Sequence, residues 1–315
     1  MFSLFNKQKN DSSSALVAGQ NGLSIVTLGL KGEYPSLEVC DFTPWENKGD
    51  TKAILAKKVK QFGLAKKPCN TVLELGDYSI LSVDMPDVPP DELRAAVRWQ
   101  IKDLIDYHVD DAIVDIFDMP PSGATNKQSS TYVVVARRSI VQNLITRMQD
   151  AKVNLSVADI PELVLRNISQ RLIENEVGVV MVYLTRESGL LVITRQSTLY
   201  FARPLPIGYE QLNRGITDTE TGNNPQFDQL VLEVQRSLDY YDRYFQQPTV
   251  SGLVLTPTEV PIAGLDIYLH QMLGLKVRML NLGEFVDCEP DMSVEEQAHC
   301  VMAVGAAMRK ESASL

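Results

Sequence analysis

The chain has 315 residues and an acidic balance: 30 Lys and Arg face 40 Asp and Glu, for a formal net charge of −10 at pH 7. Hydrophobic residues make up 44% of the chain and charged residues 22%, which is typical of a soluble globular protein. A chain of this length usually exceeds a single hydrophobic core, so we expect two units of roughly 150 residues. The negative charge argues against a dedicated nucleic-acid binder, because neutralising phosphates requires a basic surface.

The sequence also indicates where the protein is located and whether it binds a metal. No apolar run approaches the roughly 20 residues that span a bilayer. The apolar start of the chain is shorter than the roughly 7–15 residues of a signal-peptide core. We therefore expect a cytoplasmic protein with a flexible tail at residues 1–14. The four cysteines and three histidines have neither C-x-x-C nor metal-ligand spacing, so we predict no metal site and no disulfide.

From residue 15 onward, short apolar strands alternate with amphipathic helices. The predicted strands of the first half are residues 16–19, 23–30, 37–42, 71–75, 80–85, 113–119, 131–136 and 155–158. The predicted helices are residues 51–62, 89–105, 139–151 and 161–172. Tight turns separate the first three strands, which favours a hairpin followed by a third strand.

The pattern of the opening strands recurs at Val177. Strands are predicted at residues 177–184, 189–194, 198–205, 252–255 and 277–280, and helices at residues 227–245, 265–273 and 294–309. Ser293, followed by two glutamates in the first turn, is a typical N-cap for the last helix. The repeat predicts an α/β protein of two similar lobes around a cleft, with the first lobe at residues 15–174 and the second at residues 175–315.

Several sequence blocks follow the order of a known family. The block Glu233-Val234-Gln235-Arg236-Ser237-Leu238-Asp239-Tyr240-Tyr241 is similar to the pattern E-I-x-R-S-L-x-Y-Y of a long helix in PilM-type proteins. Residues 92–110 resemble the family's "I-R-W-E … Y-I-P-F-P-L-D-E", residues 133–138 its "V-L-L-V-A-A-R-K" and residues 158–162 its "V-D-V-E-A". The resemblance covers nearly the whole chain, from about residue 15 to residue 309.

The resemblance implies a two-lobed actin-like ATPase fold, related to that of FtsA, with a nucleotide cleft between the lobes. It also implies an inserted subdomain in the first lobe, at about residues 78–152. PilM-type proteins bind the short cytoplasmic tail of a PilN-type, single-pass assembly protein. The expected function is therefore that of a scaffold of a type IV pilus machine, peripheral to the cytoplasmic face of the inner membrane.

The first phosphate loop of the family has the pattern D-I-G-S-x-S-V-K. Its glycine lets the backbone approach a phosphate, and its aspartate positions Mg²⁺ or water. The matching segment, residues 19–26, contains no acidic residue, and Val26 stands at the lysine position. Asn21, Gly22 and Ser24 are the positions that could still hold an anion, weakly.

The second phosphate loop and the adenosine turn of the family also have no close match. For the second loop, "V-D-I-G-A-x-S-T", Tyr183 falls at the aspartate position and Thr185 at the glycine position, followed by Arg186. A threonine disfavours the positive φ that a tight phosphate turn tends to use. The adenosine turn "S-G-G-G-A" is replaced by Thr256-Pro257-Thr258-Glu259, which has no glycine.

Three independent elements depart from the family pattern together. We therefore predict a degenerate cleft, no ATPase activity and no bound cofactor. No other phosphate loop, G-x-x-x-x-G-K-[ST] or G-x-G-x-x-G, occurs in the sequence. The alternative is an ATP-binding switch or weak ATPase of the same fold that uses ATP and Mg²⁺, in which Arg186 contacts a phosphate.

Two aromatic residues of the expected subdomain are candidate contacts for the partner. Trp99 lies on the helix face away from Leu93 and Val97, and Tyr107 follows the same helix. Exposed aromatic side chains often anchor partner proteins. The alternative is that both side chains pack against the strands of the subdomain.

Overall fold

The computed structural model describes residues 12–29, 34–45, 51–89, 91–121, 123, 130–214 and 224–310. Most of the predicted tail, residues 1–11, lies outside these residues. The prediction was wrong at its end, because the strand β1 (Ser12–Ala18) begins at Ser12. The serines extend the strand because β1 pairs antiparallel with β2 (Gly22–Gly29), and the buried Ser14 hydroxyl lies 3.0 Å from the Thr27 hydroxyl.

The first lobe is built on a five-stranded sheet of order β3-β2-β1-β4-β8. Its remaining strands are β3 (Ser36–Pro44), β4 (Cys69–Val72) and β8 (Leu155–Asp159). The helices α1 (Thr51–Phe62) and α3 (Arg138–Asp150) cover one face of this sheet, where Leu16 and Ile25 join their buried residues. Val26, the neighbour of Ile25, points into a different core on the other face, as the twofold period of a strand requires.

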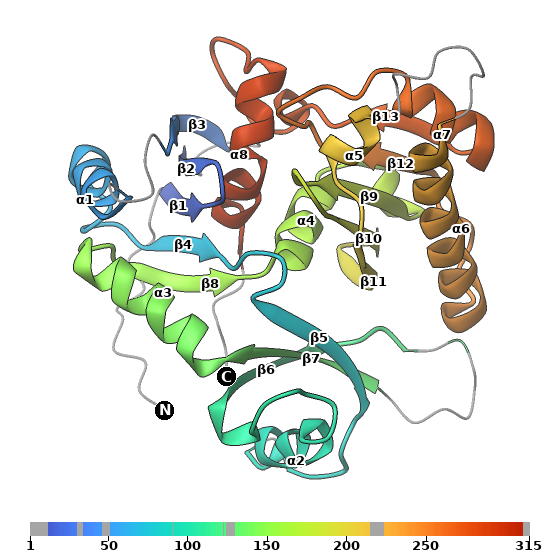
Figure 1. Cartoon of the computed structure of the whole chain (residues 1–315), viewed down its shortest axis with the longest axis horizontal. Coiled ribbons are helices and arrows are strands. Elements are labelled where there is room, and N and C mark those ends of the chain that lie inside the picture. The colour runs from blue at the N-terminus through green and yellow to red at the C-terminus, as the bar shows by residue number, and fades with distance from the viewer. Residues whose placement is uncertain are drawn as a thin grey trace.

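The second lobe repeats this topology. Its sheet has the order β11-β10-β9-β12-β13. As in the first lobe, three consecutive antiparallel strands form one side of the sheet, and two strands parallel to the first of them form the other side. The strands are β9 (Val179–Leu184), β10 (Gly189–Arg195), β11 (Thr198–Leu205), β12 (Gly252–Leu255) and β13 (Lys276–Met279). The helices are α5 (Tyr209–Arg214), α6 (Pro225–Phe245) and α7 (Leu265–Leu273). The duplication that the sequence predicts is therefore confirmed (Figure 1).

An inserted subdomain lies between β4 and α3. It contains the sheet β5-β7-β6 and the helix α2 (Leu93–Ile101). Its strands are β5 (Tyr78–Asp84), β6 (Ala112–Asp118) and β7 (Ser130–Arg137). The predicted range of 78–152 extends past β7 to include α3, but Leu144 and Met148 of α3 pack in the core of the first lobe. The subdomain itself therefore ends near Arg137.

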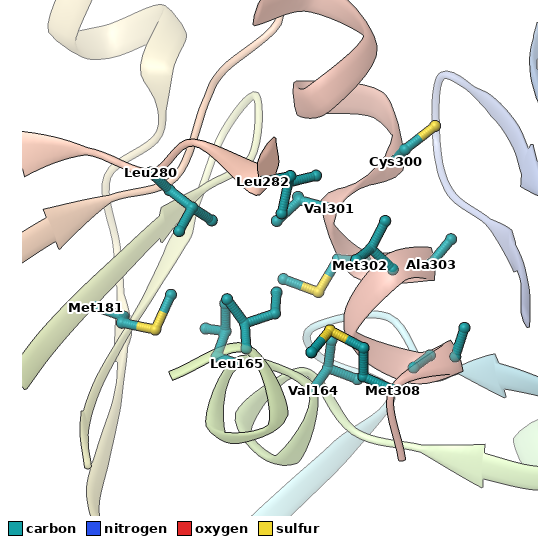
Figure 2. Packing of buried hydrophobic residues seen from close by; sticks show 14 of the residues in the cluster. Val164, Leu165, Met181, Leu280, Leu282, Cys300, Val301, Met302, Ala303 and Met308 are labelled. Atoms are coloured by element: carbon teal, nitrogen blue, oxygen red, sulfur yellow. The ribbon is translucent and has the colours of Figure 1, made fainter. Parts of the chain in front are cut away.

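Two helices cross between the lobes. The helix α4 (Pro161–Ser169) follows the last strand of the first lobe but packs on the sheet of the second, and α8 (Val294–Ala307) follows the second lobe but packs on the sheet of the first. Figure 2 shows Val164 and Leu165 of α4 opposite Met302 of α8, within one core shared by both lobes. The predicted boundary near residue 174 separates the strands of the two sheets, whereas each of these helices lies on the sheet of the other lobe.

The C-terminal end of α8 is fixed by side chains of the first lobe and of α4. The amide of Asn70 in β4 donates to the carbonyl of Ala306, and that of Asn167 in α4 donates to the carbonyl of Gly305. These bonds satisfy carbonyls that have no partner within the helix. Gly305 itself permits the close crossing, because a Cβ there would lie 2.6 Å from a methyl group of Val164 and 2.8 Å from its carbonyl oxygen.

Candidate functional site

A cavity of about 160 Å³ lies between the lobes, beside the crossing helices. It is lined by the β1–β2 turn, the β9–β10 turn and the segment after β12, which are the three segments that the sequence predicts around a nucleotide. Six of the seven predicted positions line it: Asn21, Gly22, Ser24, Thr185, Arg186 and Thr258. The seventh, Thr256, is buried outside the cavity and donates to the carbonyl of Val182. The volume is below the roughly 300–1,000 Å³ that is typical of small-molecule pockets.

A carboxylate of the protein itself lines this cavity and bonds across it. The side-chain amide of Asn21 in the first lobe donates to both carboxylate oxygens of Glu259 in the second, at 2.8 Å each. The hydroxyl of Tyr209, at the start of α5, donates to the same carboxylate at 3.1 Å. We call this group of three residues the Glu259 latch, because it joins the two lobes across the cleft.

A histidine closes the same cleft from α8. The ring of His299 stacks on Phe42 of β3, with centroids 3.6 Å apart, and its Nδ1 lies 3.6 Å from a Glu259 oxygen. The hydroxyl of Ser24 donates to the backbone carbonyl of His299 at 2.6 Å. Ser24 therefore binds the last helix, where the sequence had suggested that it holds an anion.

The β1–β2 and β9–β10 turns, which stand at the positions of the two phosphate loops, make their contacts within the protein. In the β1–β2 turn, a Cβ at Gly22 would lie 2.5 Å from the Phe42 ring and 2.6 Å from the Thr43 carbonyl oxygen, so packing against β3 accounts for this glycine. In the β9–β10 turn, the amide of Thr185 donates to the Ser188 carbonyl at 2.8 Å, and the amide of Ser188 donates to the Thr185 hydroxyl at 3.2 Å. Two of the backbone donors of this turn are therefore bonded within the turn itself.

The charges around the cavity are also unfavourable for a phosphate. The guanidinium of Arg186 is exposed and bonds Glu210 of α5 at 2.6 Å, so a carboxylate of the protein already pairs with it. Glu259 and Glu74 both line the cavity. Burial, together with these two carboxylates, raises the pKa of Tyr183 to about 12. Among the described residues that line the cavity, Arg186 is the one Lys or Arg, and it is paired with Glu210. A nucleotide phosphate would therefore meet Glu259 and Glu74 with little positive charge to offset them.

A second, larger cavity of about 510 Å³ forms a groove between the inserted subdomain and the second lobe. Residues of β5 line one side, and Leu199, Phe201, Ala202 and Pro204 of β11 line the other. We call it the β5–β11 groove. Its wall is mostly apolar and aromatic, with Phe117 and Tyr240 contributing from β6 and α6.

Both strands that border the groove are at the edge of their sheets. The strand β5 pairs only with β7, and β11 pairs only with β10, among the described strands. The Tyr132 hydroxyl of β7 donates to the Tyr200 carbonyl of β11 at 2.7 Å and fixes the subdomain against the second lobe. Sequence reasoning missed this groove, because its two sides are about 120 residues apart and meet only through the tertiary fold.

The two aromatic candidates of the subdomain have different surroundings. The side chain of Trp99 is 72% exposed, and the ammonium group of Lys102 lies 5.0 Å from its ring centroid. Tyr107 is half-buried against the core under α2, with the guanidinium of Arg137 at 4.1 Å from its ring centroid. The structure thus assigns packing to Tyr107 and leaves Trp99 open to solvent. Neither residue lines the β5–β11 groove.

No protein-family model matches the chain, and no curated protein matches it. Among solved structures, the chain is similar to one described as the PilM-PilN type IV pilus biogenesis complex, with a TM-score of 0.73 and 20% identity over 94% of this chain and 97% of that chain. It is also similar to the cytoplasmic domain of EpsL, an inner-membrane component of the type II secretion system of Vibrio cholerae, with a TM-score of 0.51 and 12% identity over 96% of this chain and 97% of that chain. Among the described residues, none of the helices is both long enough and apolar enough for a membrane span. The repeated topology and these similarities identify the two-lobed actin-like fold.

Proposed function

We propose that the protein is a scaffold of a type IV pilus assembly machine that binds the cytoplasmic tail of a PilN-type inner-membrane protein as an extended segment in the β5–β11 groove. The observation that carries this proposal is the groove itself, an apolar channel between two unpaired strand edges. The fold is that of a chain solved in a PilM-PilN complex, which supports a partner of this kind.

Strand edges are well suited to hold an extended peptide. Each edge presents backbone N–H and C=O groups without a partner strand, and a peptide that adds to the edge satisfies them. Side chains of such a peptide alternate between two faces, so every second one can enter the apolar wall of the groove. Main-chain bonds then supply affinity, and the pockets along the wall supply specificity.

The cleft between the lobes supports a role without catalysis. The Glu259 carboxylate lines the cavity in which the resemblance implies a nucleotide, and the amides of Thr185 and Ser188 are bonded within the β9–β10 turn. We therefore propose a pseudo-ATPase without a bound cofactor. Titration with Mg·ATP separates this proposal from the alternative of an ATP-binding switch: no heat at millimolar ATP is expected, and micromolar binding that Arg186→Ala abolishes would favour the switch.

The place of the protein in the cell follows from its partner. A PilN-type tail would hold the scaffold at the cytoplasmic face of the inner membrane. We propose the mannose-sensitive haemagglutinin (MSHA) pilus as the machine, with a role like that of its component MshI, because the sequence also resembles that protein. A peptide from an MSHA-type PilN protein should accordingly bind more tightly than one from another pilus system.

Isothermal titration with a synthetic peptide of the PilN-type cytoplasmic tail tests the docking site. Ser82 is exposed and lines the groove, so Ser82→Arg should block the groove and weaken binding about tenfold or more. Ser156→Arg, a change of the same kind on an exposed position of β8 outside the groove, is the matched control. No binding at tens of micromolar peptide would contradict the proposal, and loss of binding in Trp99→Ala alone would move the docking site to α2.

A further inference from the structure

One side chain of the β5–β11 groove differs from the rest of its wall. Glu162, in the first turn of α4, is only 3% exposed, yet it lines the groove together with Tyr78 of β5. The hydroxyl of Tyr78 donates to the Glu162 carboxylate at 2.5 Å. A buried carboxylate thus stands in a wall that is otherwise mostly apolar.

The carboxylate of Glu162 has hydrogen-bond donors but no positive partner among the described residues. Asp159, close by, forms a 2.7 Å ion pair with Arg309, whereas no Lys or Arg of the described chain pairs with Glu162. A buried ionised carboxylate is costly unless it is paired, because it has lost its water. A basic group that entered the groove would offset this cost.

The surroundings of Glu162 act on its pKa in both directions, with a net rise. Burial raises the pKa of Glu162, while the hydroxyl of Tyr78 and its own backbone amide lower it, and the carboxylate of Asp159 adds a smaller repulsion. The N-terminal turn of α4 also favours the ionised form. A cation that entered the groove would favour that form further.

We infer that the bound tail supplies this cation: a lysine or arginine side chain of the extended segment pairs with Glu162 at the wall of the groove. The inference rests on the docking proposed above and adds the chemistry by which the groove selects its partner. Because an extended segment presents every second side chain to one face, the basic residue should have apolar neighbours two positions before and after it. Aromatic rings at Phe201 and Tyr240 line the same groove and suit those apolar neighbours.

The test measures coupling between the two charges by isothermal titration of the full chain. The probes are the synthetic PilN-type tail peptide and a set in which each Lys or Arg is replaced in turn by Met. Glu162→Gln keeps the shape of the side chain and removes its charge, and Ser156→Arg outside the groove controls for non-specific electrostatic effects. Should Glu162→Gln fail to fold, the peptide set with the unchanged protein still tests the inference.

One basic residue of the peptide should prove critical. Replacing it by Met is expected to weaken binding to the unchanged protein about tenfold or more, and to have little effect on binding to Glu162→Gln. The inference would be overturned if the peptide binds tightly and neither any Lys or Arg replacement nor Glu162→Gln changes its affinity. The docking proposal would then remain intact. Losses that simply add would also overturn it, since they indicate two independent contacts. No binding of any peptide would overturn the docking proposal and this inference together.

Discussion

The Glu259 latch makes a quantitative prediction about how the lobes are held together. In Glu259→Ala, the amide of Asn21 loses two 2.8 Å contacts and the hydroxyl of Tyr209 loses one at 3.1 Å. A hydrogen bond to a charged group contributes about 1.5–3 kcal/mol when fully formed. The side chain of Glu259 is 31% exposed, so water screens the charge and replaces part of what is lost. We therefore expect the free energy of unfolding to fall by about 1–2 kcal/mol.

A double-mutant cycle isolates the contact between the lobes. Asn21→Ala should cost about 1 kcal/mol, and the double variant should cost clearly less than the sum, with a coupling of about 1 kcal/mol. Urea denaturation followed by circular dichroism measures all four proteins. The core shared by the lobes favours a single transition, which makes the comparison direct. Glu187→Ala, an exposed glutamate in the adjacent turn, is the control and should change little.

Strict additivity in this cycle would refute the reasoning about the latch. In that case the carboxylate contributes nothing that depends on Asn21, and the crossing helices alone hold the lobes together. Single losses below about 0.3 kcal/mol would lead to the same conclusion, because they fall within the error of the method.

Three further predictions concern the crossing helices and the groove. Gly305→Ala should lower the free energy of unfolding by up to about 2 kcal/mol, because overpacking against α4 costs about 1–3 kcal/mol and the better helix propensity of alanine returns about 1. Gly19→Ala, where a Cβ meets nothing within 4 Å, should be neutral in the same urea titration. Arg309→Met leaves the Asp159 carboxylate, which is 1% exposed, without its 2.7 Å ion pair. The variant should have a strongly lowered melting temperature, because the free energy of unfolding falls by about 3–5 kcal/mol. A fall below about 1 kcal/mol would contradict this account. The pKa of Glu162 is raised above 4.5 in the folded state, so the folded state binds more protons than the unfolded state just above that pH. The contribution of this group to the free energy of unfolding should therefore fall as pH rises through that window. In a series of urea titrations, Glu162→Gln should remove this fall.

The sequence predicts the order of the elements because local signals determine them. Four elements have the bounds that the sequence predicts: Thr51–Phe62, Thr198–Leu205, Gly252–Leu255 and Leu265–Leu273. The last helix begins after Ser293, where the serine and Glu296 form a capping box. These signals act within one or two turns of the chain, so they can be recognised without the fold.

Features that depend on tertiary contacts are less accessible to such reasoning. The predicted strand at residues 71–75 is instead Cys69–Val72, because pairing with β1 and β8 determines its register. The predicted helix to residue 105 ends at Ile101. The exchange of α4 and α8 between the lobes has no local signal, because the spacing of apolar residues along a helix does not specify which sheet the helix covers.

The sequence predicts which loop segments meet in the cleft, whereas the contacts within the cleft are visible only in the structure. The loop segments converge as the resemblance implies, with Thr256 as the exception. That Glu259 binds Asn21, and that Arg186 turns to Glu210, depends on side chains from segments far apart in the chain. The β5–β11 groove had no sequence signal at all, because an edge strand is defined by the absence of a neighbour.

Hydrogen–deuterium exchange on the full chain, with and without the PilN-type tail peptide, tests the central claim most directly. If the peptide adds as a strand in the β5–β11 groove, amides along the free edge of β5 or of β11 should exchange more slowly in the complex. The amides of α2 and of the cleft turns should be unchanged. Saturating peptide that protects α2 around Trp99, or that protects neither edge strand, would contradict the account.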